Sequence, residues 1–253
     1  ASTSQSNNTK TLNDKTAPTI SSVSLAFDNS TVAVIFSEHV FPVSDAPVRS
    51  NYDMGLTRQD FTLSISGGIA TLSSATPSIV DTSLQTEEKK LTLSIPLSGT
   101  PNGSEILTIN PSEQSIFDWS GNEASTSQSN NTKTLNDKTV PTISSVSLAS
   151  DNSTIAVTFS EAVYNTNGGS GSLEVADFAF SISGGAATLG SATPSSISSS
   201  GNVYTLGISL SGTPNGSETV TVNPVDDSIY DAAGNEASTS QSNNTATLND
   251  KAA

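Results

Sequence analysis

The sequence repeats itself, and this repetition constrains the fold more than any other feature. Residues 124–148 read ASTSQSNNTKTLNDKTVPTISSVSL and repeat residues 1–25 with one substitution, and the same segment begins again at Ala237. The copies start 123 residues apart, at residues 1 and 124, and then 113 residues apart, at 124 and 237. Each period has the length of one small domain, so a tandem array is expected. We expect domains at residues 13–135 and 136–253, called repeat 1 and repeat 2 below.

Residues 1–12 fall outside these two domains. They copy the segment that ends each repeat, so the chain has three copies of a final strand but only two domains. They are predicted to be either the last strand of a preceding repeat or a strand exchanged with a neighbouring molecule, as strand addition does in some filaments.

Apolar residues alternate with polar ones in short runs between turn residues, the pattern of half-buried β-strands. In repeat 2 the alternating positions are Ile155, Val157 and Phe159; Phe178, Phe180 and Ile182; Ala187 and Leu189, more weakly; Tyr204, Leu206, Ile208 and Leu210; and Val220 and Val222. The first strand of the repeat, which precedes Ile155, has a break in its alternation at Ser144-Ser145, and this break predicts a bulge or a switch between sheets. Residues 238–248 are nearly all polar and are expected to form an edge strand. Each repeat is therefore predicted to be an all-β antiparallel sandwich of about seven strands.

The composition narrows the classes of partner. The chain has 9 Lys and Arg residues against 24 Asp and Glu residues, a formal net charge of −15. Such a surface repels nucleic acid and anionic membranes and attracts divalent cations. The sequence has no cysteine, which excludes disulfides and thiolate metal sites. It has no apolar run of about 18 residues, so no membrane insertion is expected. The acidic, hydroxyl-rich and repetitive composition favours an extracellular location.

Acidic and amide side chains gather at one end of the expected sandwich. The N-terminal linker, the loop after the second strand and the loop before the last strand all reach this end. The candidate ligands there are Asp14, Glu38, Asp60, Asp118 and Asn122 in repeat 1, and Asp137, Glu161, Asp177, Asp227, Asp231 and Asn235 in repeat 2. Converging carboxylates repel one another, and a hard cation with six to eight oxygen ligands removes that cost. We therefore predict calcium at this end of each repeat; the alternative is that these side chains cap their own turns and are solvated.

The residues needed for catalysis are missing. His39 is the only histidine, and without cysteine or a serine in a nucleophile elbow no catalytic triad or zinc site can be built. Glu38 and Glu161 occupy equivalent positions in two domains, whereas a glycosidase needs two carboxylates flanking one cleft. A carbohydrate-binding module would need an exposed aromatic platform, and four Tyr and one Trp spread over two domains favour no such platform. We expect no enzymatic activity.

Four short motifs resemble a known group of proteins. Repeat 2 carries NDKTVPTISSVSL, FSEAV, ADF and DAAGN, and repeat 1 carries NDKTAPTISSVSL, FSEHV, QDF and DWSGN. Together they resemble the bacterial immunoglobulin-like repeats of large surface adhesins and other secreted cell-surface proteins. The resemblance covers both repeats and implies immunoglobulin-like sandwiches. It also implies that the linker acid and the acids of neighbouring loops bind calcium and stiffen a rod, with Asp14, Asp118, Asp137 and Asp231 as the first candidates.

The sequence as a whole predicts a non-catalytic, calcium-stiffened spacer of a bacterial surface protein. Its partners are expected to be neighbouring repeats or like subunits, and a terminal ligand would be bound outside this sequence. The main alternative is a subunit of an extracellular filament or surface layer, assembled by strand exchange or edge pairing. A carbohydrate-binding accessory module is a third, weaker prediction.

Overall fold

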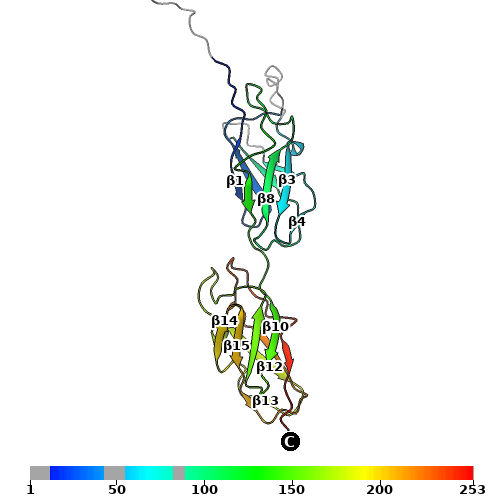
Figure 1. Ribbon diagram of the computed structural model, residues 1–253, viewed down its shortest axis with the longest axis vertical. Helices are drawn as coiled ribbons and strands as arrows, with labels where there is room; N and C mark the ends of the chain where they lie inside the picture. The colour runs from blue at the N-terminus through cyan, green and yellow to red at the C-terminus, as the bar shows by residue number, and fades with distance from the viewer. Residues whose placement is uncertain (1–11, 43–54, 82–88, 253) are drawn as a thin grey trace, which may run out of the picture. The chain divides into compact units, whose positions relative to one another are not determined.

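The chain forms two compact units, residues Ala1–Asp137 and Lys138–Ala253. A computed structural model describes residues 12–42, 55–81 and 89–252 (Figure 1). Except for Leu12, the segment 1–12 that was predicted to be an extra strand therefore lies outside the described residues. In the described part of the chain, no helix is long and apolar enough to cross a membrane.

The first unit is a sandwich of a four-stranded and a three-stranded antiparallel sheet. The first sheet has the order β1-β2-β6-β5, formed by β1 (Ile20–Leu25), β2 (Thr31–Phe36), β6 (Lys90–Ser94) and β5 (Ile79–Asp81). The second sheet has the order β3-β8-β9, formed by β3 (Phe61–Ser66), β8 (Ile106–Pro111) and β9 (Thr132–Thr134). A two-stranded ribbon pairs β4 (Thr71–Leu72) with β7 (Leu97–Ser98), and a 3₁₀ turn, η2 (Arg58–Asp60), precedes β3.

The second unit repeats this plan. Its four-stranded sheet has the order β10-β11-β15-β14, formed by β10 (Ile143–Leu148), β11 (Thr154–Phe159), β15 (Val203–Gly207) and β14 (Ile197–Ser200). Its three-stranded sheet has the order β12-β17-β18, formed by β12 (Phe178–Ser183), β17 (Thr219–Pro224) and β18 (Thr245–Thr247). Its ribbon pairs β13 (Thr188–Leu189) with β16 (Leu210–Ser211), and its 3₁₀ turn is η4 (Val175–Asp177). A four-plus-three arrangement in this order is that of constant-type immunoglobulin domains. The predicted all-β, immunoglobulin-like sandwich fold is confirmed for both units.

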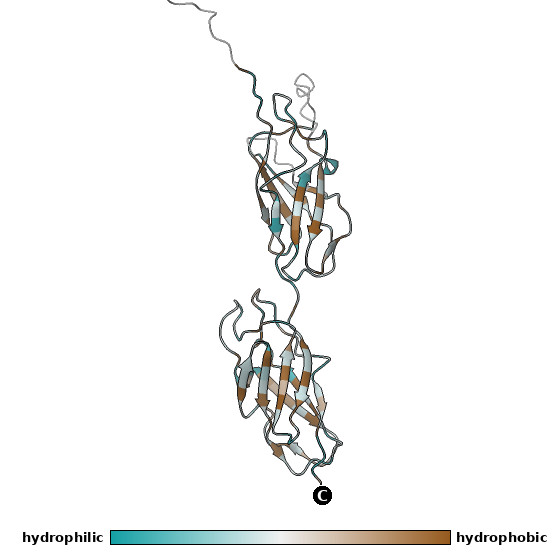
Figure 2. Cartoon of the chain, in the orientation of Figure 1, coloured by the Kyte–Doolittle hydropathy of each residue, from teal (hydrophilic) through white to brown (hydrophobic). Residues whose placement is uncertain are grey.

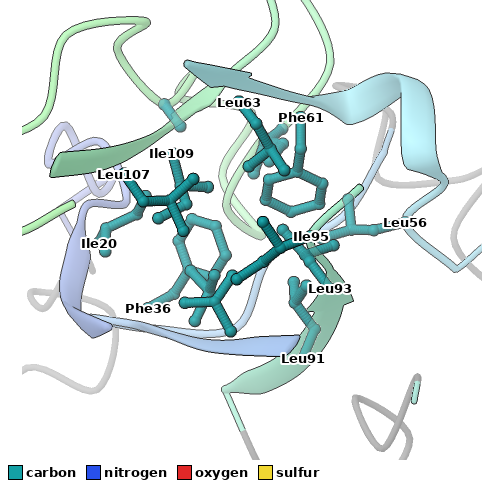
Figure 3. Close-up of a cluster of buried hydrophobic side chains, with 14 of the residues drawn as sticks. Ile20, Phe36, Leu56, Phe61, Leu63, Leu91, Leu93, Ile95, Leu107 and Ile109 are labelled. Carbon is teal, nitrogen blue, oxygen red and sulfur yellow. The ribbon is translucent and has the colours of Figure 1, made fainter. Parts of the chain in front are cut away.

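The core of each unit lies between its two sheets. Along β2 and β11, buried apolar residues alternate with less buried ones, and brown and paler segments alternate along the strands in Figure 2. In the first unit Phe61 and Ile109 of one sheet point toward Phe36 and Leu93 of the other (Figure 3), and all four are at most 1% exposed. Burying such side chains contributes about 1.5 to 3 kcal/mol each, which makes this layer the main source of stability.

The break in phase of the first strand is a β-bulge. The pairing register between β10 and β11 shifts between Ile143 and Ser145, and β1 shows the same shift between Ile20 and Ser22. The extra residue lets Ile143 enter the core while both following serines face solvent. Of the two explanations that the sequence left open, the structure therefore selects the bulge.

Three strand predictions need correction. The strand expected to extend to Leu210 ends at Gly207, and Leu210–Ser211 pairs instead with Thr188–Leu189 in the separate ribbon. The polar last strand is ordered as a β-strand only over Thr245–Thr247. The edge strand Ile197–Ser200 was missed, because its sequence ISSS buries no residue and so lacks an alternating pattern.

Candidate metal centre

Three acidic side chains from three separate segments meet at one end of the first sandwich. Asp14 precedes β1, Glu38 follows β2 by two residues, and Asp118 lies in the loop between β8 and β9. One carboxylate oxygen from each lies within 4.8 Å of the others. Antiparallel strand order brings these segments together, because β2 and β8 both end at the end of the sandwich where β1 begins.

The corresponding residues of repeat 2 form a second group. Asp137, Glu161 and Asp231 also offer carboxylate oxygens within 4.8 Å of one another. In each group the acid from the loop before the last strand is buried, and the acid after the second strand is partly buried. The same arrangement in two domains indicates that it follows from the repeated motifs rather than from one accidental loop conformation.

The buried acid of each group is held by the asparagine four residues after it. Asp118 is 0% exposed, and its Oδ1 and Oδ2 accept hydrogen bonds from the backbone N–H and the Nδ2 of Asn122, both at 2.7 Å. Gly121 between them adopts a φ of 82°, which an L-residue disfavours. Asp231 and Asn235 make the same pair of bonds at 2.8 and 2.7 Å. The motif therefore fixes one carboxylate before any ligand arrives.

The two asparagines, which were predicted to supply amide oxygens to a metal, lie beside the buried aspartate of each group, and their Nδ2 atoms donate to it. The Nδ2 of Asn122 faces the carboxylate of Asp118 and also approaches the carbonyl oxygens of Asp14 (3.3 Å) and Thr16 (3.4 Å). Asn235 likewise approaches the Thr139 carbonyl at 3.4 Å. An amide group donating to these oxygens orients the aspartate and ties its loop to the segment before the first strand.

The pKa of Glu38 shows the effect of crowding like charges. Partial burial raises its pKa above the ordinary 4.5, and the neighbouring negative charges of Asp118 and Asp14 raise it further. Lys89 partly offsets this effect, although its ammonium donates its hydrogen bond to the Ser37 carbonyl at 2.5 Å. A carboxylate with a raised pKa in a cluster of acids is a group whose charged form lacks compensation.

Three further predicted ligands belong to neither group. Asp60 and Asp177 close the 3₁₀ turns before β3 and β12: their Oδ2 atoms accept the backbone N–H of Thr57 at 2.5 Å and of Glu174 at 2.6 Å. Asp227 lies in a left-handed turn with a φ of 55°, and its Oδ1 accepts a hydrogen bond from the Tyr230 hydroxyl at 3.4 Å. These residues were placed at the correct end of the sandwich, but local hydrogen bonds direct them to their own turns, which is the alternative role that the sequence left open.

Two buried glutamates were missed. Glu105 and Glu218 are both 0% exposed, and each lies just before the strand β8 or β17, at the opposite end of its sandwich from the acidic group. The Oε1 of Glu105 accepts the backbone N–H groups of Ile69 (2.8 Å) and Ala70 (2.9 Å), and its Oε2 accepts that of Asn102 at 3.0 Å. In the sequence both residues follow a polar, glycine-rich turn, which gave no signal of burial.

Backbone hydrogen bonds change the acidity of these glutamates. The N–H of Ala187, helped by those of Ala186 and Asn215, lowers the pKa of Glu218 from 4.5 to about 2. For Glu105 burial acts to raise the pKa, but the N–H groups of Ala70, Ile69 and Asn102 outweigh it and the pKa is lowered. Both side chains are satisfied by the protein itself and present no open oxygen pair to a metal.

The three-carboxylate groups fit a calcium ion in donor type and size. Calcium binds carboxylate oxygens at about 2.3 to 2.6 Å, so opposite ligands lie up to about 5 Å apart. Oxygens within 4.8 Å of one another can therefore share one ion. Three carboxylates leave further coordination positions for carbonyl oxygens or water, as extracellular calcium sites commonly have.

Comparison with known proteins adds little to this description. No family model matches the sequence, and no curated protein matches it. The chain is similar to the N-terminal part of the bacterial S-layer protein SbsC, with 18% identity, a TM-score of 0.31 and 92% of this chain covered, and it spans 43% of that structure's length. It is also similar to a chimeric titin Z1Z2 carrying an exogenous KLER peptide from decorin, with 13% identity, a TM-score of 0.23 and coverage of 92% of this chain and 95% of that one.

TM-scores this low carry no argument about function. The resemblance to bacterial immunoglobulin-like repeats therefore stays a prediction.

Proposed function

We propose that each repeat binds calcium at the end where its chain enters, and that the protein is a non-catalytic structural spacer of a bacterial cell surface. The observation that carries the proposal is the convergence of three carboxylates from three segments, Asp14, Glu38 and Asp118, and its repetition in the second repeat. Two unit charges 4 Å apart repel by about 1 to 4 kcal/mol, depending on how far solvent screens them. A calcium ion would supply the positive charge that removes this repulsion.

The residues of the chain determine what such binding would do. Asn122 holds Asp118 in place, so the loop before the last strand contributes a fixed ligand. Asp14 belongs to the segment that precedes the first strand, and its carboxylate also accepts the N–H of Thr16 at 2.9 Å. Binding that involves all three acids would tie this entering segment to two loops of the sandwich. A linker restrained in this way bends less, which is the property that a spacer needs.

The surface location is part of the same proposal. A net charge of −15 suits a protein exposed to calcium-rich surroundings. Calcium sites of extracellular modules have dissociation constants of about 0.1 to 1 mM, which match millimolar calcium outside cells. The first partners would then be neighbouring repeats of the same chain.

Calcium titration tests the proposal. At 10 mM calcium, a dissociation constant of about 0.1 to 1 mM stabilises the folded unit by about 1.5 to 3 kcal/mol. The melting temperature of the wild-type chain should rise on adding calcium and fall back with EDTA. Asp118→Asn should remove most of this rise for the first unit, whereas Glu113→Gln, which removes an exposed acid outside the group, should keep it. An unchanged melting temperature of the wild type with calcium would refute the metal site.

Assembly into a filament or surface layer is the second candidate. One observation favours it: residues 1–12 have the same sequence as residues 124–135, which end the first sandwich. The carbohydrate-binding alternative gains little, because Trp119, although 62% exposed, meets Phe41 edge to face at an angle of 66°. Rings so inclined do not form a flat platform for a sugar.

A further inference from the structure

The segment that ends each sandwich is held by four side chains at fixed spacing. In the first unit this segment is residues 124–135, and it contains β9. Ala124 is 1% exposed and Leu135 is 2% exposed, so both ends of the segment enter the core. Between them, Gln128 Oε1 accepts the N–H of Ile20 from the other sheet at 2.8 Å. Asn131, 3% exposed, donates its Nδ2 to the Ile109 carbonyl at 2.8 Å.

The second unit uses the same four anchors. Ala237 is 1% exposed and Leu248 is 2% exposed. Gln241 Oε1 accepts the N–H of Ile143 at 2.9 Å, and Asn244 Nδ2 donates to the Val222 carbonyl at 2.8 Å. The anchors are therefore the first, fifth, eighth and twelfth residues of the segment. We call this anchored segment the closing strand.

Residues 1–12 contain all four anchors. Their sequence, ASTSQSNNTKTL, is identical to residues 124–135 and places Ala1, Gln5, Asn8 and Leu12 at the four positions. Asn13 then matches Asn136, whose backbone N–H donates to Asn29 Oδ1 at 2.9 Å. Yet Leu12 is 89% exposed, whereas its two counterparts are 2% exposed. In the first sandwich the core position that corresponds to Leu12 is already taken by Leu135.

The closing strand forms the edge of its sheet. β9 pairs with β8 over only three residues, Thr132–Thr134, and all three are exposed. The segment is thus held by its anchors and by one side of one strand. A second segment of identical sequence would fill the same edge with the same bonds, so the exchange has no cost in contacts. Only the high effective concentration of the attached strand favours the chain's own copy.

We propose that residues 1–13 are a closing strand for a second copy of this chain, taking the β8 edge of that copy whenever its own residues 124–135 leave it. Such an exchange is heterologous: the N-terminal segment of one molecule completes a sandwich of the next. Contacts of this kind generate open, head-to-tail chains. The inference deepens the strand-exchange alternative and is independent of the calcium proposal.

The test opens the β8 edge in one variant and removes the incoming anchor in another. Leu135→Asp places a charge in a buried position and should lower the melting temperature of the first unit by about 10 °C or more. The intact Leu12 of another molecule should then compensate. We expect the full-length Leu135→Asp chain to form oligomers whose mass, measured by light scattering, grows with protein concentration. The double variant Leu12→Asp/Leu135→Asp and the single variant Leu12→Asp should both remain monomeric.

A synthetic peptide of residues 1–13 provides the second readout. Added to Leu135→Asp, it should dissolve the oligomers and recover at least half of the lost melting temperature, whereas the same peptide with Leu12→Asp should do neither. If Leu135→Asp and the double variant have the same mass, or if both aggregate alike, the proposal is wrong. All measurements are made in EDTA, so that failure here leaves the calcium titration unaffected, and failure of that titration leaves this result unaffected.

Discussion

The two ends of the first sandwich differ in how their acidic side chains are compensated. At the end where the chain enters, Glu38 sits beside Asp14 and Asp118, and its pKa is raised by burial and by these negative neighbours. At the opposite end Glu105 is fully buried, but backbone N–H groups from two turns surround its carboxylate and its pKa is lowered. The more deeply buried acid is thus the better satisfied one.

This difference shows that burial alone does not identify a metal ligand. A carboxylate enclosed by backbone donors keeps its charge without a cation, because each donor supplies a charge-assisted hydrogen bond. A carboxylate that faces other carboxylates is destabilised in its charged form, and a bound cation would remove this repulsion. The following experiments separate the two situations, in order of decreasing effect.

Removing a buried glutamate should have the largest effect. Glu105→Ala removes the acceptor of one buried N–H group, that of Ala70, and of two partly buried ones, those of Ile69 and Asn102. At about 1 to 3 kcal/mol for each unsatisfied donor, we expect the free energy of unfolding of the first unit to fall by about 3 to 5 kcal/mol. Urea denaturation measures it. The exposed Glu113→Gln should change it by less than about 0.5 kcal/mol, and equal effects of the two variants would contradict the assignment.

A methyl group added beside this glutamate should act nearly as strongly. A Cβ on Gly68 would lie 2.1 Å from the Glu105 Cδ, at a backbone φ of +60°. We expect Gly68→Ala to cost about 2 to 4 kcal/mol, of which the left-handed backbone accounts for about 1 to 2. Gly201→Ala is the matched control, because Gly201 has a φ of +58° but open space around its Cβ. The double variant Gly68→Ala/Glu105→Ala should lose less stability than the sum of the two single losses, because removing the glutamate also removes the clash. Strict additivity would contradict the close contact.

The lowered pKa of Glu218 predicts that the stability of the second unit depends on pH in the acidic range. Because the pKa falls from 4.5 in the unfolded chain to about 2 in the folded one, the stabilisation is complete above pH 4.5 and is lost as the pH falls toward 2. Melting curves of the second unit between pH 7 and pH 2 should show this loss. Glu218→Gln should flatten the dependence, whereas the exposed Asp226→Asn should not. A wild type with unchanged stability down to pH 2 would exclude the hydrogen-bonded carboxylate.

The smallest effect is expected at the acidic group and has the opposite sign. Because the pKa of Glu38 is raised, its contribution to the stability of the metal-free chain is lost as the pH rises above about 4.5. Glu38→Gln should therefore stabilise the first unit at pH 7 in EDTA by a few tenths of a kcal/mol, since solvent screens much of the repulsion. In 10 mM calcium the same variant should be less stable than the wild type. Destabilisation in both conditions would indicate a purely structural role.

Most of the fold could be predicted from the sequence, because its central strands show a clear alternation of apolar and polar residues. Alternation at Ile155, Val157 and Phe159 identified a central strand, because a strand with one buried face needs that period. The edge strand Ile197–Ser200 could not be found in this way, since neither of its faces is fully buried. Strand ends were also missed where alternation continued past Gly207, because pairing partners rather than hydropathy determine where a strand stops.

The candidate site was predicted in outline but not in detail. The topology of the sandwich sufficed to bring Asp14, Glu38 and Asp118 to one end. It did not show that Asp60 would accept the backbone N–H of Thr57, or that the Nδ2 of Asn122 would donate to Asp118. Such choices depend on distances of a few tenths of an ångström between groups in one loop, which residue spacing does not determine.

The sequence by itself determined the number of domains, their all-β class, the positions of the central strands and the end of each sandwich at which the acids gather. These features follow from period and strand order, which are properties of the chain read in one dimension. Only the tertiary structure decided which acids meet one another and which are enclosed by backbone donors. Glu105 shows why: its partners Ile69 and Ala70 lie more than 30 residues away, and the turn that carries it looks polar and exposed until the fold brings a second turn over it.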